Sequence, residues 1–299
     1  MKSWLIYIPF RIAAGLFGLL PEPAIRWIGE RGGGALYRRD SGRAPLLARH
    51  MRRVLGPEAP EADIDAAVKG MYRSYGRYWT ETFWFRPRRK KAITRRVERI
   101  NFDPIFEAKR AGRGIVFAVP HMGNWEIAGI IAQEIGVPIL AVAEDLSNEH
   151  ITDWFIAVRD KFDIDIVLTT DPKRRSRLIR TLRGGGAIAL LADRDITGRG
   201  IEVDFFGERT TVPAGPVALA DLTDSALIPV GVYFQEGAGH RIVVHDTVVL
   251  PGGGSRAERV SRGAQEVANV LEDMIRESPS QWHLFGANWP SDAVSEEQE

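Results

Sequence analysis

The segment Gly114-Ile115-Val116-Phe117-Ala118-Val119-Pro120, followed directly by His121-Met122-Gly123-Asn124-Trp125-Glu126, decides the fold prediction. Its first half is an unbroken apolar run rich in β-branched residues, which is typical of a buried strand. Asn124 is a good capping residue, so a helix is predicted over residues 125–135 with Glu126 in its first turn. His121 would then lie at the carboxyl end of a strand, where open α/β sheets bind their ligands.

The spacing of His121 and Glu126 indicates a candidate general base. A carboxylate that fixes the tautomer and orientation of an imidazole prepares it to take a proton from a hydroxyl group. The same two residues also fit a hydrogen-bonded structural histidine and a glutamate favoured by the helix dipole, so the spacing leaves both interpretations open. A zinc site is not indicated, because the i, i+4 histidine pair of a helical zinc motif is absent.

The composition narrows the class of protein. The 299 residues include 40 basic and 39 acidic side chains, and this balance argues against a nucleic-acid partner. The chain has no cysteine, which excludes disulfides, a thiolate nucleophile and cysteine-bound metal. We expect no cofactor and no metal. The length is sufficient for one large domain or for one domain with a helical extension.

The order of elements predicts an α/β fold after a helical start. Residues 1–97 read as helices, with segments at 4–20, 21–37 and 61–85. Residues 98–290 alternate between strands and helices, which predicts a mixed central sheet with helices on both faces. The predicted strands are 114–120, 137–142, 164–168 and 187–192, with helices at 125–135, 148–162 and 173–183, a hairpin of 227–235 with 241–248, and a helix at 255–277. Residues 291–299 form an acidic tail that is predicted to be disordered.

The amino-terminal segment is strongly apolar. Pro9 and Arg11 interrupt it, and its length is at the low edge of the ~20 residues that a membrane-spanning helix needs. No small-residue cleavage site follows, so we expect no cleaved signal peptide. One helical face carries a row of apolar side chains: Leu5, Ile8, Ile12, Leu16 and Leu19. This pattern fits a helix lying at a membrane surface, and it equally fits a first core helix.

A concentrated basic run covers residues 86–91, and Arg95 and Arg96 follow it. Such a run is usually a solvated surface. Next to an apolar amino terminus it could also contact anionic lipid headgroups, at about 1 kcal/mol for each basic residue near the surface.

A second cluster of charged residues ends another apolar strand. Asp193 and Asp195 flank Arg194 directly after Leu190-Leu191-Ala192. If the sheet is built as predicted, these charges lie at the same edge as His121. An ion-pair network without a catalytic role explains the cluster equally well.

These segments together resemble the bacterial lysophospholipid and lipid A acyltransferase superfamily, and most closely its actinobacterial phosphatidylinositol mannoside acyltransferases. The resemblance runs over about residues 4–290 and keeps the order of the motifs. It rests on His121-x4-Glu126, Leu191-Ala192-Asp193-Arg194-Asp195, Glu202-Val203-Asp204-Phe205-Phe206-Gly207, Val212-Pro213-Ala214-Gly215-Pro216 and Gln281-Trp282-His283.

The resemblance implies a peripheral enzyme on the cytoplasmic face of the plasma membrane. It would move a fatty acyl group from acyl-coenzyme A to a mannose hydroxyl of phosphatidylinositol mannoside, with the amino-terminal helix and the basic run on the membrane. His121 would be the general base, Glu126 the carboxylate of the motif, and either Asp193 or Asp195 the acid that completes a relay or binds the sugar. Substrate-binding or pocket-supporting roles are implied for Asn124, Glu144, Arg159, Arg194 and Glu202.

Several alternatives stay open from the sequence. The oxyanion of the reaction could be held by backbone N–H groups after His121 or by Arg194. Trp125 and Phe155 could line an acyl pocket or simply pack. The acceptor could instead be lipid A or another lysolipid, the base could activate water in a hydrolase, and a lipid-binding protein without turnover is a further possibility.

Overall fold

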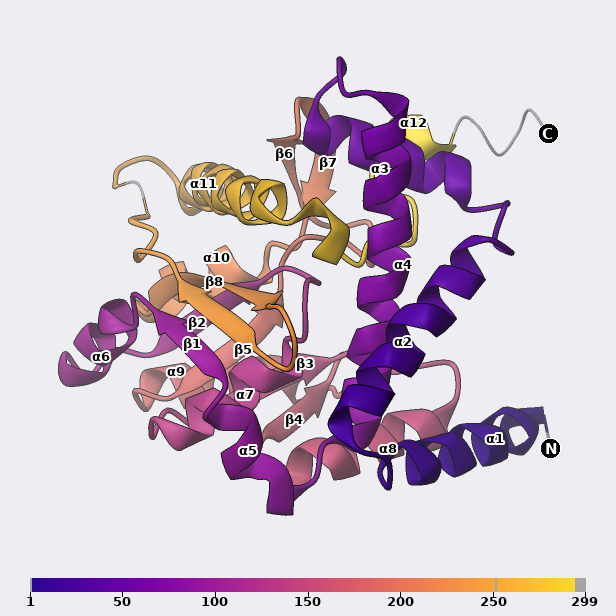
Figure 1. Ribbon diagram of the computed structural model, residues 1–299. Coiled ribbons are helices and arrows are strands. Elements are labelled where there is room, and N and C mark those ends of the chain that lie inside the picture. The colour runs from indigo at the N-terminus through magenta and orange to yellow at the C-terminus, as the bar shows by residue number, and fades with distance from the viewer. Residues whose placement is uncertain (1, 251, 294–299) are drawn as a thin grey trace.

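The computed structural model describes residues 2–250 and 252–293 and has a seven-stranded mixed sheet at its centre (Figure 1). Five strands are mutually parallel, while β9 runs antiparallel to β8 and β1 pairs in parallel with β9. The mixed sheet and the β8–β9 hairpin predicted from sequence are confirmed. The strands, in spatial order, are β1 (Val97–Ile100), β9 (His240–Val244), β8 (Ala226–Phe234), β2 (Ile115–Val119), β5 (Ala187–Leu191), β3 (Ile139–Ala143) and β4 (Asp165–Leu168).

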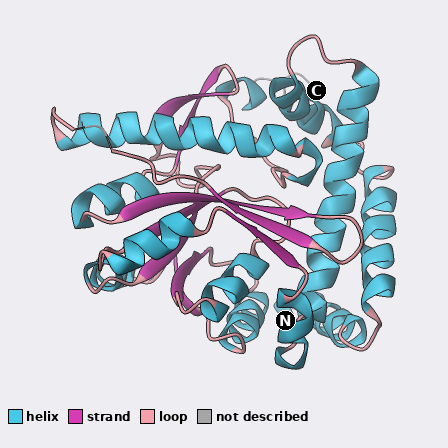
Figure 2. Ribbon diagram, turned by 60° about the vertical axis from the view of Figure 1, so that its left-hand side comes forward, coloured by secondary structure: helices cyan, strands magenta, loops and turns pink. Residues whose placement is uncertain are grey.

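Helices cover both faces of the sheet (Figure 2). One face packs against α9 (Arg174–Arg183), α10 (Gly215–Thr223) and α11 (Arg256–Glu277). The other packs against α5 (Lys90–Thr94), α6 (Asp103–Arg110) and α7 (Glu126–Glu134), with α8 (Glu149–Asp160) beside β4. Side chains along β2 alternate between the two apolar clusters, so its five residues are all buried, as the apolar run predicted.

The amino-terminal region consists of helices, as predicted. It contains α1 (Lys2–Phe17), α2 (Glu22–Tyr37), α3 (Ala44–Leu55), α4 (Glu61–Trp84) and the short η1 (Pro87–Arg89), of which α3 was not predicted. Helices α2 and α4 lie side by side (Figure 1), with glycines at the contact. A Cβ atom on Gly33 would lie 2.1 Å from the Tyr72 carbonyl oxygen, so only glycine permits this approach.

Two further parts of the chain were not assigned from sequence. The residues after Asp195 form a separate antiparallel pair, β6 (Ile201–Phe205) and β7 (Glu208–Val212). Phe206 and Gly207 connect them with positive φ angles of 53° and 76°, as a tight hairpin turn requires. After the short η2 (Pro279–Gln281), the chain ends its described part in α12 (Pro290–Ala293), where Asp292 is buried. Of the predicted tail, residues 291–293 therefore belong to a helix, and 294–299 lie outside the described residues.

Helix α1 has one packed face and one exposed face. Phe10, Ala14 and Phe17 belong to a cluster with Phe83 of α4 and Trp154 of α8. The row predicted from sequence faces outward: Leu5, Ile8, Ile12, Leu16 and Leu19 are all more than half exposed. Within the described residues, no helix is both long enough and apolar enough to cross a membrane.

Part of the basic run is turned inward. Arg86 donates hydrogen bonds to the carbonyl oxygens of Phe83, Phe85 and Ala14, and Arg89 donates to those of Trp84 and Gly18. These two guanidinium groups therefore cap the ends of α1 and α4 instead of standing free in solvent.

Candidate active site

His121 and Asp193 meet at the carboxyl edge of the sheet. His121 follows β2 and Asp193 follows β5, and the two strands pair in parallel with Val119 opposite Leu191. The shared edge predicted from sequence is thus confirmed. The His121 Nδ1 atom lies 2.7 Å from Asp193 Oδ1, so of the two candidate aspartates it is Asp193 that holds the imidazole.

Asp193 is fully buried, and both of its carboxylate oxygens are engaged. Its Oδ2 atom accepts a hydrogen bond of 2.7 Å from the indole N–H of Trp282. Burial by itself would raise the pKa of Asp193, but the neighbouring His121 ring and the hydrogen bonds from His121 and Trp282 outweigh it and lower the pKa below its usual value. Asp193 is therefore an ionised acceptor at neutral pH.

This contact fixes the tautomer of His121. A carboxylate only accepts hydrogen bonds, so Nδ1 carries the proton and Nε2 keeps its lone pair. The imidazole is about one fifth exposed and lines the main cavity. The arrangement has the geometry of a general base toward a group bound in that cavity.

Asp195 stabilises the turn that follows β5. Its Oδ1 atom accepts from the N–H and the hydroxyl of Thr197, and its Oδ2 atom accepts from Gly200 N–H and the Thr211 hydroxyl. Burial would raise its pKa, but these donors lower it. With both oxygens engaged by this turn and by Thr211 of β7, Asp195 does not take the place of Asp193 beside the histidine.

Glu126 does not hold His121, so the pairing inferred from their spacing is wrong. Glu126 instead forms a two-pronged ion pair with Arg159 of α8, at 2.9 and 2.6 Å, and accepts from the Tyr78 hydroxyl at 3.3 Å. Burial would lower the pKa of Arg159, yet the Glu126 charge raises it. Glu126 begins α7, and its carboxylate reaches Arg159 of α8 instead of the imidazole at the strand end.

Asn124 does not cap the helix, contrary to the prediction. Trp125 occupies the N-cap position without a capping hydrogen bond from its side chain, and the Asn124 amide donates to Glu81 at 3.0 Å. Glu81 is buried and also binds Arg77 and His240. Burial would raise the pKa of Glu81, but His240 and Arg77 lower it to about 2. Asn124 thus ties the motif loop to α4.

The loop between His121 and Asn124 is held tightly against the carboxyl-terminal segment. Gly123 has a φ of 56°, and a Cβ atom there would lie 2.1 Å from the Val232 carbonyl oxygen, so this position requires glycine. The Gly123 N–H donates to Gln281, and the N–H of His283 donates to the carbonyl of His121. The motif loop is therefore built together with residues 281–283.

His283 is a second imidazole at the cavity, and no role was assigned to it from sequence. Its Nε2 atom lies 2.8 Å from the Ser74 hydroxyl, and its ring is almost completely buried beside Tyr75 and Trp125. Burial, followed by the proximity of His121, lowers the pKa of His283 to about 3. It is therefore neutral in the folded protein near pH 7.

The main cavity has a volume of about 360 Å³ and runs beneath the sheet from His121. It is lined from β9 to β4, six neighbouring strands, which corresponds to a width of about 24 Å. Small side chains leave this space open, among them Ala141 and Ala189 on the sheet and Ala128, Gly129 and Ala132 on α7. Trp125 and Phe155, for which the sequence left pocket lining and ordinary packing open, both line it.

The polar predicted residues divide into two groups. Glu144, Arg159 and Arg194 line the main cavity, and Glu144 and Arg194 follow β3 and β5 at the same carboxyl edge of the sheet as His121. Glu202 lies on the exposed hairpin beside Arg209 and contributes, with Asp195, to a separate small pocket. Among residues 2–250 and 252–293, no three histidine or acidic side chains are arranged to hold a metal ion.

Two of the backbone N–H groups that could have held the oxyanion already donate hydrogen bonds to carbonyl oxygens of the protein. The N–H of Met122 donates to Pro120, and that of Gly123 donates to Gln281. Arg194 lines the cavity, and no ion pair joins it to another described residue. Of the candidates left open by the sequence, Arg194 is therefore the donor whose charge is available to a ligand.

Comparison with known proteins identifies the family. The sequence model of the bacterial lipid A biosynthesis acyltransferases matches residues 1–291. The chain belongs to this family. The acyltransferase is 34% identical over 291 residues to the phosphatidylinositol mannoside acyltransferase of Mycolicibacterium smegmatis, covering 95% of this chain and 92% of the relative.

More distant relatives include members from both branches. The acyltransferase is 33% identical over 277 residues to the phosphatidylinositol mannoside acyltransferase of Mycobacterium tuberculosis, covering 91% of this chain and 85% of that protein. It is 23% identical over 198 residues to a lipid A biosynthesis acyltransferase of Haemophilus influenzae, covering 65% and 59% of the two chains.

Proposed function

We propose that this acyltransferase moves a palmitoyl-type fatty acyl group from acyl-coenzyme A to a mannose hydroxyl of phosphatidylinositol mannoside. The observation that carries the proposal is the His121–Asp193 pair opening onto a long apolar cavity. The named mycobacterial relatives, which match nearly the whole chain, support the choice of acceptor.

The reaction needs one base and no covalent enzyme intermediate. Nε2 of His121 takes the proton from the mannose hydroxyl as its oxygen attacks the thioester carbonyl. Asp193 stabilises the imidazolium that forms, and collapse of the tetrahedral intermediate breaks the carbon–sulfur bond. The departing coenzyme A thiolate then receives the proton from His121. Base catalysis of this kind contributes about 10²–10⁴-fold in rate.

Arg194 is the proposed donor to the negative oxygen of the intermediate. Its guanidinium lines the cavity without a carboxylate partner among the described residues, whereas Arg159 is neutralised by Glu126. A cation already in place where charge develops stabilises the transition state without further reorganisation.

The two ends of the cavity suit different parts of the substrates. Beneath β8 and β9 its walls are apolar, with Phe102, Ile105, Val230, Ile242 and Val244, and we assign this end to the acyl chain. The histidine end is bordered by the polar side chains of Glu144, Arg159 and Arg194. We assign that rim to the sugar and to the thioester.

The exposed face of α1 is the proposed contact with the membrane. The outward row, four apolar side chains on α1 and Leu19 just after its end, would be costly in water and would gain about 25 cal/mol for each Å² buried in lipid. Trp27 and Leu36 of α2 are also more than half exposed. A peripheral position on the cytoplasmic face of the plasma membrane gives the enzyme both a lipid acceptor and soluble acyl-coenzyme A.

The proposal is tested by supplying radiolabelled palmitoyl-coenzyme A with either purified phosphatidylinositol mannoside or a lipid A precursor. Label in the mannolipid, dependent on enzyme, supports the proposal. Label in the lipid A precursor alone would favour the second branch of the family, to which the Haemophilus influenzae relative belongs. Release of free fatty acid alone indicates a hydrolase, and tight binding of acyl-coenzyme A without turnover indicates a lipid-binding protein.

A further inference from the structure

The indole N–H of Trp282 contacts the buried carboxylate that holds His121. Its Nε1 atom donates to Asp193 Oδ2 at 2.7 Å, while Asp193 Oδ1 faces His121 Nδ1 at the same distance. An indole N–H only donates, so it requires an acceptor at Oδ2. It thereby prevents the carboxylate from turning and keeps Oδ1 directed at the imidazole.

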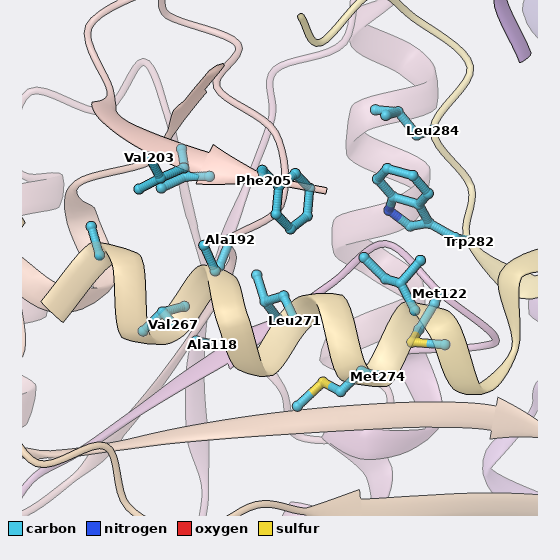
Figure 3. Close-up of a cluster of buried hydrophobic side chains, with 14 of the residues drawn as sticks. Ala118, Met122, Ala192, Val203, Phe205, Val267, Leu271, Met274, Trp282 and Leu284 are labelled. Atoms are coloured by element: carbon cyan, nitrogen blue, oxygen red, sulfur yellow. The ribbon is translucent and has the colours of Figure 1, made fainter. Parts of the chain in front are cut away.

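Trp282 is itself fixed from several sides. Its ring is fully buried in the cluster with Met122 and Leu284 beside α11 (Figure 3). Its backbone forms a bridge with Met122, and the preceding Gln281 side chain binds both the N–H and the carbonyl of Phe234. These contacts fix the backbone of residues 281–282 relative to the motif loop, and Trp282 reaches Asp193 from this fixed segment.

We infer that Trp282 is a positioning residue of the acyl-transfer reaction, acting through Asp193 to keep the proton on Nδ1 of His121 and the lone pair on Nε2. Without this donor, one oxygen of a fully buried carboxylate would lose its partner. The carboxylate would then rotate or take up a proton, and in either state it orients the imidazole less well. The inference rests on the proposed function where it predicts reaction rates. Its prediction for the tautomer of the His121 ring does not depend on that function.

The Trp282→Phe variant keeps an aromatic ring and removes the N–H group. We expect kcat to fall roughly ten- to hundredfold, the range that corresponds to one hydrogen bond to a charged group, with the KM for acyl-coenzyme A nearly unchanged. Without the indole N–H, the negative charge of the Asp193 carboxylate is less stabilised, and protonation of the His121–Asp193 pair becomes more favourable. The acid limb of the pH–rate profile should therefore move to higher pH.

Trp289→Phe is the matched control. Trp289 is also buried in the carboxyl-terminal segment and also uses its indole N–H, but it donates to the carbonyl of Phe205. This variant loses a similar volume and one hydrogen bond, and its acid limb should stay where it is in the wild type. If both variants lose activity equally with unchanged pH profiles, Trp282 only packs and the inference is overturned.

A second measurement separates positioning from folding and from the proposed function. ¹⁵N-histidine NMR reports which ring nitrogen of His121 carries the proton, whatever reaction the protein catalyses. The isosteric analogue 3-benzothienylalanine at position 282 keeps the shape of the ring and lacks the N–H, so it serves if Trp282→Phe does not fold. A mixture of His121 tautomers in Trp282→Phe or in the benzothienylalanine protein supports the inference. The same single tautomer as in the wild type contradicts it. Wild-type protein with a single tautomer and no acyl transfer would contradict the proposed function alone.

Discussion

Replacing Asp193 with asparagine should force His121 into the wrong tautomer. In the wild type, Asp193 accepts one N–H from His121 and one from Trp282. Asparagine offers one oxygen and one NH₂ group in nearly the same shape. Because the Trp282 indole must donate, the amide oxygen turns toward Trp282 and the NH₂ group faces His121. Nδ1 then becomes the acceptor, and the proton moves to Nε2, where it blocks the base.

The size of the loss follows from the alternative orientation. To restore the productive tautomer, the amide would have to flip, leaving NH₂ facing the indole N–H in a fully buried site. Such a clash of donors costs about 3 kcal/mol, which leaves the productive form at roughly one part in a hundred. We therefore expect kcat to fall at least ~100-fold, and up to the ~10⁴-fold found for the same exchange in a serine protease triad.

The assay is thiol release from palmitoyl-coenzyme A at saturating donor and acceptor. Asp195→Asn is the control, because Asp195 accepts hydrogen bonds from its own turn and from Thr211 of β7 but none from His121, and this variant should lose less than tenfold. Thermal unfolding of both variants checks that they fold. An Asp193→Asn enzyme that keeps more than a tenth of the wild-type kcat, or an equal loss in both variants, would refute the tautomer argument.

Three other predictions concern the cavity, the membrane face and the second histidine. Ile105→Trp should shorten the preferred acyl donor in a chain-length series, because it fills the apolar part of the cavity beneath β8 and β9, whereas Ile166→Trp in β4, on the other side of β2, should not. The reverse result would place the chain beneath β3 and β4. Changing Ile12 and Leu16 together to serine should release the protein from phospholipid vesicles in a flotation assay without lowering its thermal stability, since both side chains are exposed; unchanged flotation would remove α1 as the contact. The pKa of His283 is about 3 in the folded protein, against 6.5 for a histidine side chain in water. As pH falls below ~6.5 the unfolded chain binds a proton that the folded chain does not, so this residue lowers the free energy of unfolding by about 1 kcal/mol per pH unit down to about pH 3. The slope between pH 6.5 and 5 in urea titrations should be smaller for His283→Gln, and equal slopes would contradict a neutral buried ring.

The sequence predicted the parts of the fold that depend on local pattern. The apolar runs and their period identified β2 and β5, and two parallel strands that end in polar residues must bring those residues to one edge. That reasoning joined His121 to Asp193 across 72 positions of sequence. It did not find β6 and β7, because β7 (Glu208-Arg209-Thr210-Thr211-Val212) has no alternating apolar pattern and the turn between the strands begins with phenylalanine rather than glycine or asparagine.

The sequence could not tell which carboxylate meets the imidazole. Spacing pointed to Glu126, but its carboxylate is bound by Arg159, which is 33 residues further along the chain and cannot be paired with it from local pattern. Asp193 and Asp195 look alike in the sequence, but in the structure Asp193 is bound by the His121 and Trp282 rings, whereas Asp195 is bound by Thr197, Gly200 and Thr211. The Trp282 contact depends on a segment that returns from the far end of the chain, and local pattern carries no signal for such a contact.

The most direct measurement of the central claim is acceptor-dependent acyl transfer by His121→Ala. The variant should fold normally and still bind acyl-coenzyme A, since the cavity wall is otherwise unchanged, while its transfer rate to phosphatidylinositol mannoside falls at least ~100-fold. A transfer rate within a few fold of the wild type would mean that His121 is not the base.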